Sequence, residues 1–330
     1  MGLEGLAAIA AGSVGALIGE PRRAALPSQC PASIFICPVR LPDGCLPPGP
    51  MPCRIGAGSA LDSGTARGLC LLEGIERYSL QFRAGDPESL ASTAMPGTRD
   101  VSLPIEKLRL GHPSQRNGGP ITDSRGCSVG ADLADAALRG LLELAEHDAL
   151  GIWRANPDRF HEVDPRGLTD ALDGLLAWLE ANGFRSRIFA HRHNSGATAY
   201  VGVCSGAAGD RPATGTAAGI DARRAAVHAC VESVVAWFNL AEIEKNLSRI
   251  DDLPPEDRLD IEIYRGAVRM PNFSSAPEGL RSASTASTMQ GRPSIAFRRL
   301  VESWGIKVAV FDLSRPETGI VAARVVQLSE

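Results

Sequence analysis

The sequence has few lysines, no paired cysteine motif and none of the common nucleotide-binding motifs. Its 330 residues include only three lysines, Lys107, Lys245 and Lys307, so catalysis through a lysine has few candidates. None of the eight cysteines forms a Cys-x-x-Cys pair, which favours reduced thiols within a core over a structural zinc site. Neither a Walker lysine motif nor a complete Gly-x-Gly-x-x-Gly is present, so any nucleotide site is not of the P-loop or Rossmann type.

Charge and hydropathy indicate an ordinary soluble protein. The net charge of −4 gives no reason to expect a nucleic-acid partner. The apolar stretch from Leu6 to Ile18 lacks a basic segment before it, which favours a buried first helix over a signal peptide. No apolar run is long enough to predict a membrane span. We therefore expect a cytoplasmic protein without a membrane partner.

Helical and strand patterns alternate along the chain, which predicts an α/β or α+β fold. We expect residues 1–55 to form a helix and strand segment with a proline-rich loop, packed on a main domain of residues 56–330. The apolar run 34–37 predicts a strand in the first segment. The segment 215–219 is predicted to be a flexible link before a helix, and 272–294, rich in serine, alanine and proline, a mobile loop.

Three predicted helices carry acidic residues within apolar runs. Two are near copies, with Glu73 and Glu76 in one and Glu143 and Glu146 in the other, and a third helix carries Glu232. Residues three apart share a helix face, and the flanking leucines indicate that this face is partly buried. Buried carboxylates are costly unless a cation meets them, and Mg²⁺ commonly binds carboxylates together with substrate phosphates. The pattern predicts a shared metal or metal–phosphate site.

Each part of this pattern has a simpler interpretation. Glu73 has Arg77 four residues later, so an intrahelical salt bridge explains one pair alone. The glycine-rich turns before two of the helices could present backbone N–H groups to phosphate, but each is also typical of an ordinary tight turn. His191 and His193 share one face of a predicted strand, where a metal could reach both, although a polar cluster beside a turn is the commoner arrangement. It is the repetition of the acidic helices that favours a common site.

A family resemblance is carried by three signatures and a closing segment. They are Gly56-Ala57-Gly58 with Ala66 and Leu72-Glu73-Gly74-Ile75-Glu76-Arg77-Tyr78-Ser79, then Asp123-Ser124, Gly126 and Gly130 with Gly140-Leu141-Leu142-Glu143 and Glu146 to Ala149, then Gly215 to Glu232, and Gly305 to Val326. Over roughly residues 50 to 330 the chain resembles YcaO-domain proteins.

The resemblance implies a YcaO-like fold and a chemistry. YcaO proteins bind ATP and Mg²⁺ and activate backbone amides of a ribosomally made precursor peptide. A Cys, Ser or Thr side chain attacks the preceding carbonyl, the oxyanion takes a phosphoryl group, and loss of phosphate gives a thiazoline or oxazoline. Relatives use an external nucleophile and form thioamides or amidines. A separate leader-binding or accessory protein and a homodimer are further partners that the resemblance implies.

The resemblance also implies roles for particular residues. Those implied to hold Mg²⁺ are Glu73, Glu76, Glu143, Glu146 and Glu232. Those implied to bind the nucleotide are Arg77, Ser124, Gly126, Asp135 and His147. Arg77 and Glu146 are implied to be catalytic.

The chain departs from the family pattern at several positions. His147 stands where an arginine is usual, Leu69 replaces a common serine, and Arg125 and Ala131 stand where many members have asparagine. The chain also reaches Glu330 without the proline-rich tail of many azoline-forming members, which leaves thioamide formation open. These departures motivate an alternative function, a noncatalytic scaffold that binds the precursor peptide or a partner enzyme.

A carboxylate-bridged di-metal oxidoreductase is a further alternative of a different class. Glu-x-x-Glu helices occur there, but such sites also need Glu-x-x-His pairs. Here His147 follows Glu143 by four residues rather than three, so the pattern favours the ATP-dependent enzyme.

Overall fold

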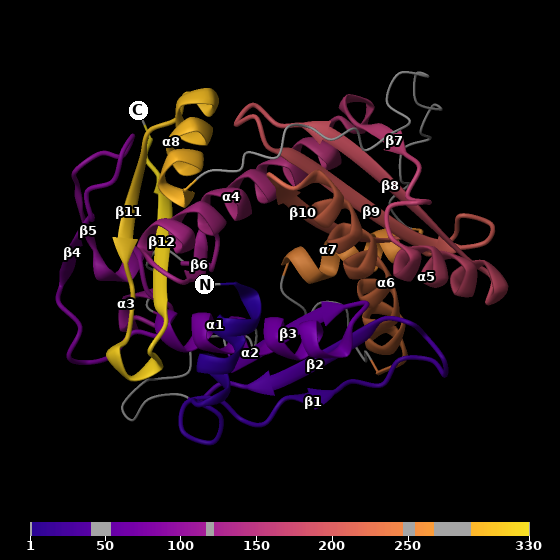
Figure 1. The fold of residues 1–330 in the computed structure, drawn as a ribbon, viewed down its shortest axis with the longest axis horizontal. Helices are drawn as coiled ribbons and strands as arrows, with labels where there is room; N and C mark the ends of the chain where they lie inside the picture. Colours follow the sequence, from indigo (N-terminus) through magenta and orange to yellow (C-terminus); the bar gives the residue numbers. More distant parts are fainter. Residues whose placement is uncertain (1, 41–53, 117–121, 247–254, 267–291, 330) are drawn as a thin grey trace.

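The computed structural model describes residues 2–40, 54–116, 122–246, 255–266 and 292–329 (Figure 1). The helices are α1 Leu3–Ala11, α2 Ser63–Leu80, α3 Pro113–Arg116, α4 Leu133–Ala155, α5 Asp170–Ala181, α6 Ala222–Asn246, α7 Pro255–Tyr264 and α8 Pro293–Trp304. The strands are β1 Arg22–Arg23, β2 Ser33–Pro38, β3 Ile55–Ala60, β4 Ser89–Ala91, β5 Ser102–Pro104, β6 Cys127–Gly130, β7 His161–Val163, β8 Phe184–Arg192, β9 Thr198–Gly206, β10 Ala213–Gly219, β11 Val308–Asp312 and β12 Val321–Gln327.

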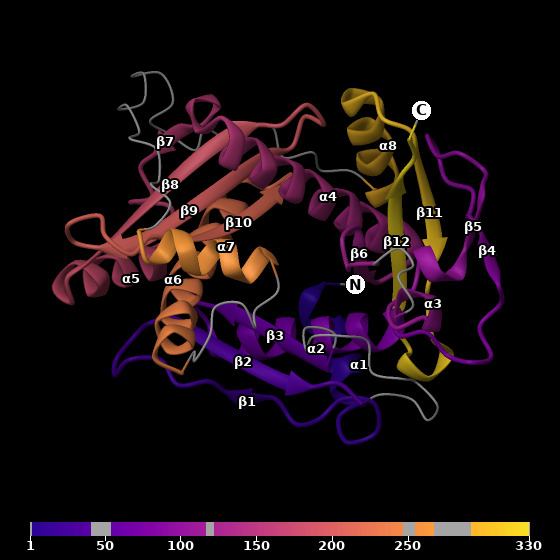
Figure 2. The ribbon, with the colours of Figure 1, turned by 180° about the vertical axis from the view of Figure 1, so that it is seen from behind.

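These strands form three antiparallel sheets and a small β4–β5 pair. The sheet orders are β1-β2-β3, β10-β9-β8-β7 and β11-β12-β6. The long helix α4 runs between the β11-β12-β6 sheet and the β10-β9-β8-β7 sheet in both views (Figures 1 and 2). Helix α2 packs on β3 and β2, and α6 packs on β10 and β9. The predicted class, mixed α/β with long acidic helices packed on several sheets, is confirmed.

Three strand–helix units share one local design. In β3–α2, β6–α4 and β10–α6, an aspartate before the helix accepts a hydrogen bond from the backbone N–H three residues later. These residues are Asp62, Asp132 and Asp221, with N···O distances of 2.7, 2.8 and 3.1 Å. Such a cap satisfies an N–H that the helix leaves unpaired and fixes where the helix begins. Each helix therefore starts at a defined distance from its strand.

The segment 215–219, predicted to be a flexible link, is instead part of β10. Thr216 pairs with Val201 and Ala217 with Tyr200 along the full edge of β9. The small side chains that suggested flexibility serve close packing, because a Cβ atom at Gly215 would lie 2.2 Å from the backbone nitrogen of Ser233 on α6. The predicted strand 34–37 is confirmed as part of β2, while most of the predicted loop 272–294 lies outside the described residues.

The close contact between Gly215 and the backbone of α6 predicts that Gly215→Ala destabilises the protein by about 3 kcal/mol, because a helix backbone cannot move aside as a flexible side chain can. Urea unfolding would measure the loss. Gly174→Ala on α5 is the matched control, because a Cβ atom there meets nothing within 4 Å and alanine suits a helix better than glycine. Equal stability of Gly215→Ala and the wild type would contradict the close packing of α6 on β10.

Within the described residues, α6 is the one helix long and apolar enough to cross a membrane by length and composition. The sequence-based prediction that no such run exists was therefore too strict. Helix α6 packs against β9 and β10 and carries Glu232 partway along its length. These contacts are those of a core helix.

Candidate functional site

The three strand–helix units place a glutamate at the same internal position. Glu73, Glu143 and Glu232 each lie eleven residues after the aspartate that caps their helix. Two of the units add a second acid one turn later, Glu76 and Glu146. Eleven residues of helix advance about 16 Å, so similar units carry these carboxylates the same distance from their caps. The electrostatic influence of these groups on one another is described below.

On α2, one arginine contacts both glutamates. Arg77 donates a hydrogen bond from Nη2 to Oε1 of Glu73 at 3.0 Å, and its Nη1 lies 3.8 Å from Oε1 of Glu76. The other carboxylate oxygen of Glu73 accepts the backbone N–H of Ala57 at 3.0 Å. Burial acts to lower the pKa of Arg77, but the surrounding carboxylates, led by Glu76, raise it above its ordinary value. The intrahelical pair therefore exists, but inside an acidic cluster that includes Glu143.

Three glutamates, Glu76, Glu143 and Glu146, have raised pKa values and so resist ionisation. Burial raises the pKa of Glu76 to about 8. Burial, and then the charge of Glu76, raise the pKa of Glu143 well above its ordinary value. Burial and the charge of Glu232 raise the pKa of Glu146 to about 7, although the hydroxyl of Thr216 donates to its Oε1 at 2.7 Å. Desolvation and like charges both oppose carboxylate charge here, and a bound cation would reverse both effects.

A histidine on α6 supplies a second positive charge. Nε2 of His228 lies 3.0 Å from Oε1 of Glu232, and this carboxylate is the main cause that raises the pKa of His228 to about 9. The imidazole is therefore protonated at neutral pH. Both His228 and Glu146 face the same cavity, described next.

The cavity has a volume of about 1020 Å³ and is lined by all three units. Its acidic lining includes Asp135, Glu143 and Glu146, and its basic lining includes Arg139, Arg223 and His228. Backbone from β3 and β10 completes the wall. A lining that holds both acids and cations suits a ligand that brings both metal ions and anionic groups.

Across the described ranges, no three histidine, cysteine, aspartate or glutamate side chains lie close enough together to hold a metal ion alone. This agrees with the usual coordination of Mg²⁺, which binds one or two protein carboxylates and completes its coordination shell with water and substrate phosphates. The donors offered are all oxygens, which suit Mg²⁺ rather than a soft metal. The residues present therefore fit a metal ion that arrives with a phosphate ligand.

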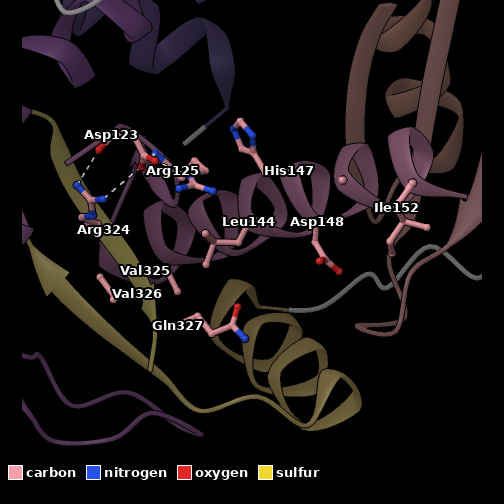
Figure 3. Close-up of a pocket in the computed structure, with 12 residues that line it drawn as sticks. Asp123, Arg125, Leu144, His147, Asp148, Ile152, Arg324, Val325, Val326 and Gln327 are labelled. Atoms are coloured by element: carbon pink, nitrogen blue, oxygen red, sulfur yellow. Dashed lines mark hydrogen bonds and ion pairs between the residues drawn. The ribbon is translucent and has the colours of Figure 1, made fainter. Parts of the chain in front are cut away.

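Not every residue implied to bind the nucleotide lies at this cavity. Asp135 lines it, whereas His147 lines a second hollow on the opposite face of α4 (Figure 3). Ser124 is flanked in sequence by Asp123 and Arg125, which both line that hollow. Gly126 packs closely against Gly140 on α4. A Cβ atom added to Gly140 would lie 2.4 Å from the carbonyl oxygen of Gly126. His147 is the link between the faces, because its Nε2 lies 3.9 Å from Oε1 of Glu143.

His191 and His193 form polar contacts within the protein rather than a common site. Nε2 of His193 lies 2.8 Å from Oδ2 of Asp148, and its Nδ1 lies 2.8 Å from Oγ of Ser195. Nδ1 of His191 lies 3.1 Å from the carbonyl oxygen of Arg159. These separate partners favour the polar-cluster interpretation.

Residues 91–327 match the family model described as YcaO cyclodehydratase, ATP- and Mg²⁺-binding. The chain belongs to the YcaO family. The matched range contains the second and third strand–helix units of this YcaO protein, while the first unit, with Glu73 and Glu76, precedes it. ATP and Mg²⁺ are the cofactors named for the family, which confirms the cofactors implied by the resemblance.

Solved structures extend the likeness to the first unit. A heterocyclase in complex with substrate and cofactor is 16% identical, with a TM-score of 0.74 over 99% of this chain and 52% of that chain. YcaO from Methanopyrus kandleri, bound with AMPPCP and Mg²⁺, is 17% identical, with a TM-score of 0.66 over 98% of this chain and 89% of that one. The E. coli microcin synthetase McbBCD complex gives 13% identity and a TM-score of 0.67, over 93% of this chain and 87% of that one.

At these identities the structures establish a shared fold. The YcaO chain spans about half the length of the heterocyclase. No curated protein is significantly similar to this YcaO chain in sequence.

Two lining residues of this YcaO cavity, Arg139 and Arg223, were not identified from the sequence, and neither was Thr216, which donates a hydrogen bond to Glu146. The sequence did carry a usable signal, the constant spacing between a capping aspartate and the glutamate eleven residues later. That spacing aligns the three units and assigns His228 to the same face as Glu232, one turn earlier.

Proposed function

We propose that this YcaO protein uses ATP and Mg²⁺ to phosphorylate a backbone amide oxygen of a ribosomally made peptide. The observation that supports this proposal best is one large cavity lined by residues of all three units, with Glu143 and Glu146 in its wall. Burial and like charges raise the pKa values of Glu76, Glu143 and Glu146, and metal ions bound to a polyphosphate would stabilise these groups as charged carboxylates.

The residues of the chain have distinct proposed roles. Glu143 and Glu146 line the cavity and would hold Mg²⁺, with Glu73, Glu76 and Glu232 around them. Bound ATP would supply the phosphoryl group, with Mg²⁺ neutralising its charge. Phosphoryl transfer depends mainly on positioning and charge stabilisation. The remaining work of the protein is therefore to orient the two reactants.

Two positive groups would face the phosphate. Arg77 is fixed by Glu73 and Glu76, which keeps its guanidinium in place and always charged. His228 is held protonated by Glu232. At the usual arginine position of the second unit stands His147, whose Nε2 lies 3.9 Å from Oε1 of Glu143. We propose that Arg77 and His228 stabilise the charge on the transferred group in its place.

The finer assignments are also part of the proposal. Cyclodehydration of Cys, Ser or Thr to an azoline is the leading reaction, and thioamide formation is the second. The peptide is proposed to be a precursor delivered with a separate leader-binding protein, in the cytoplasm, to a protein that could act as a homodimer.

Calorimetric titration with ATP in the presence of Mg²⁺ tests the proposal first. We expect binding that EDTA abolishes, because the carboxylates repel the polyphosphate without the metal. The precursor peptide encoded beside the gene, added with its accessory protein, should release ADP and phosphate. Mass spectrometry then separates the products, since cyclodehydration removes one water and thioamidation exchanges oxygen for sulfur. No binding of ATP with Mg²⁺ would overturn the proposal.

A noncatalytic scaffold is the second candidate, because Leu69 places an apolar side chain in the cavity where a serine is usual. This candidate predicts that the protein binds the precursor peptide or its partner enzyme without turnover. Release of ADP that depends on both the peptide and this chain would exclude it.

A further inference from the structure

The second hollow, with a volume of about 560 Å³, lies between one face of α4 and the end of β12 (Figure 3). Most of its ionic groups have partners within the protein. Arg125 and Arg324 share Asp123, and Asp148 lies 2.8 Å from the buried His193. Apolar side chains of Leu144 and Ile152 supply much of the remaining wall. An occupant therefore meets ionic groups that already have partners, and apolar surface that it can cover.

Strand β12 extends beyond its neighbour β6 at this hollow. Pairing with β6 covers Val321 to Arg324, and the last contact is the N–H of Val325 with the carbonyl of Gly126 at 2.8 Å. Gly126 has a φ of 74°, a left-handed conformation that suits glycine and turns the chain away from β12. Among the described residues, no strand pairs with the end of β12 on this side.

The direction of the backbone groups follows from the pairing with β11. Leu328 donates its N–H to Lys307 on the β11 side at 2.8 Å, and Gln327 opposes Val308. Because these groups alternate along a strand, the N–H and C=O of Gln327 point the other way, toward the side that β6 has left. An open strand edge of this kind is completed by another extended backbone.

We propose that this hollow holds an extended segment of the peptide substrate, added to β12 as a strand beside Gln327. The inference rests on the proposed function. Backbone hydrogen bonds would hold the segment, and alternate side chains would face Leu144 and Ile152 on α4. His147 lines the same hollow and lies 3.9 Å from Glu143. A segment held here lies across α4 from the acidic cavity, so another part of the same peptide would present the amide to the phosphoryl group.

Gly151 offers the sharpest test, because it lines the hollow on α4 and a Cβ atom there meets nothing within 4 Å. Gly151→Phe would fill the hollow without a clash at its Cβ atom, and Gly151→Ala is the matched control. Twelve-residue peptides would be selected from a random library displayed on phage, against the wild-type protein loaded with Mg²⁺ and a non-hydrolysable ATP analogue. We expect the synthesised peptides to bind Gly151→Phe at least about tenfold more weakly and Gly151→Ala unchanged.

Gln327 gives an independent test of the strand edge. Gln327→Pro removes the outward N–H but no hydrogen bond to β11, whereas Gln327→Ala keeps the N–H. We expect a roughly fivefold to tenfold loss of peptide affinity for the proline variant only. Titration with the ATP analogue and Mg²⁺ should give wild-type affinity for every variant, and thermal melting should show intact folds.

The outcomes separate the two proposals. Loss of peptide affinity in Gly151→Phe and Gln327→Pro, with nucleotide binding retained, supports the strand site. Nucleotide binding with unchanged peptide affinity in both variants overturns the strand site and leaves the proposed function standing. Failure to select any peptide counts against the strand site. If the wild-type protein is a dimer and Gln327→Pro dissociates it, the open edge of β12 pairs with a second copy of the chain, which also counts against the peptide site. Absence of nucleotide binding in the wild type overturns the proposed function itself.

Discussion

Glu143→Gln should abolish ATP turnover while leaving the protein at least as stable as the wild type. Glu143 lines the cavity, and the charge of Glu76 and its own burial disfavour the carboxylate. Glutamine keeps the shape and removes the repulsion, so the melting temperature should stay the same or rise. The metal loses an anionic oxygen ligand, and turnover should fall roughly a hundredfold or more. Gain of stability with loss of activity is typical of functional residues.

Phosphate release with peptide and accessory protein measures the activity, and thermal melting without nucleotide measures the stability. Glu180→Gln is the matched control, because Glu180 lies on the exposed surface of α5 and pairs only with Arg166. It should change neither quantity. Retained turnover in Glu143→Gln would remove Glu143 from the proposed metal site, and a strong loss of stability would show a structural role instead.

Asp86→Ala should destabilise the fold by about 3–5 kcal/mol, the usual cost of leaving a buried charge without its partner. Asp86 holds together distant parts of the chain. Its carboxylate receives two hydrogen bonds from Arg315, at 2.6 and 2.8 Å, and lies 3.3 Å from Nε of Arg109. The aspartate side chain is 5% exposed, so the variant would leave two arginines buried together without their counter-ion.

The effect should depend on pH. Burial acts to raise the pKa of Asp86, but Arg315 and Arg109 outweigh it and hold the pKa below its ordinary value. A lowered folded-state pKa adds stability above the unfolded-state pKa of about 4, and this stability is lost as the pH falls through the folded value. Urea unfolding should show the full difference in stability between the wild type and Asp86→Ala at pH 7, and a smaller difference below about pH 4. Asp158→Ala, at an exposed position, is the control, and a difference that is constant with pH would contradict this account.

The acidic helices were predictable from the sequence because their signals are local. Leucines at helical spacing and two acids three residues apart indicate a half-buried helix face without knowledge of any contact. The predicted helices around Glu73 and Glu143 correspond to α2 and α4, and the family resemblance agrees with the matched family model. Both rest on residues close together along the chain.

Three features depended on contacts between distant segments. Strand β10 contains few of the residues favoured in strands, and its pairing with β9 and its packing under α6 determine its structure. The face of α4 occupied by His147 decides that this residue lines the second hollow rather than the cavity. The protonated state of His228 likewise follows from the proximity of Glu232 in the fold. A family signature lists such residues without giving the cavity to which each belongs.

The central claim is that the three strand–helix units bind one metal–nucleotide complex between them. A crystal structure of the protein with a non-hydrolysable ATP analogue, and Mn²⁺ in place of Mg²⁺, tests it directly through the anomalous signal of the metal. The account predicts manganese peaks at the Glu143 and Glu146 carboxylates, bridged to the phosphates within the cavity of about 1020 Å³. Nucleotide and manganese bound away from these carboxylates, or no bound nucleotide at saturating concentration, would contradict it.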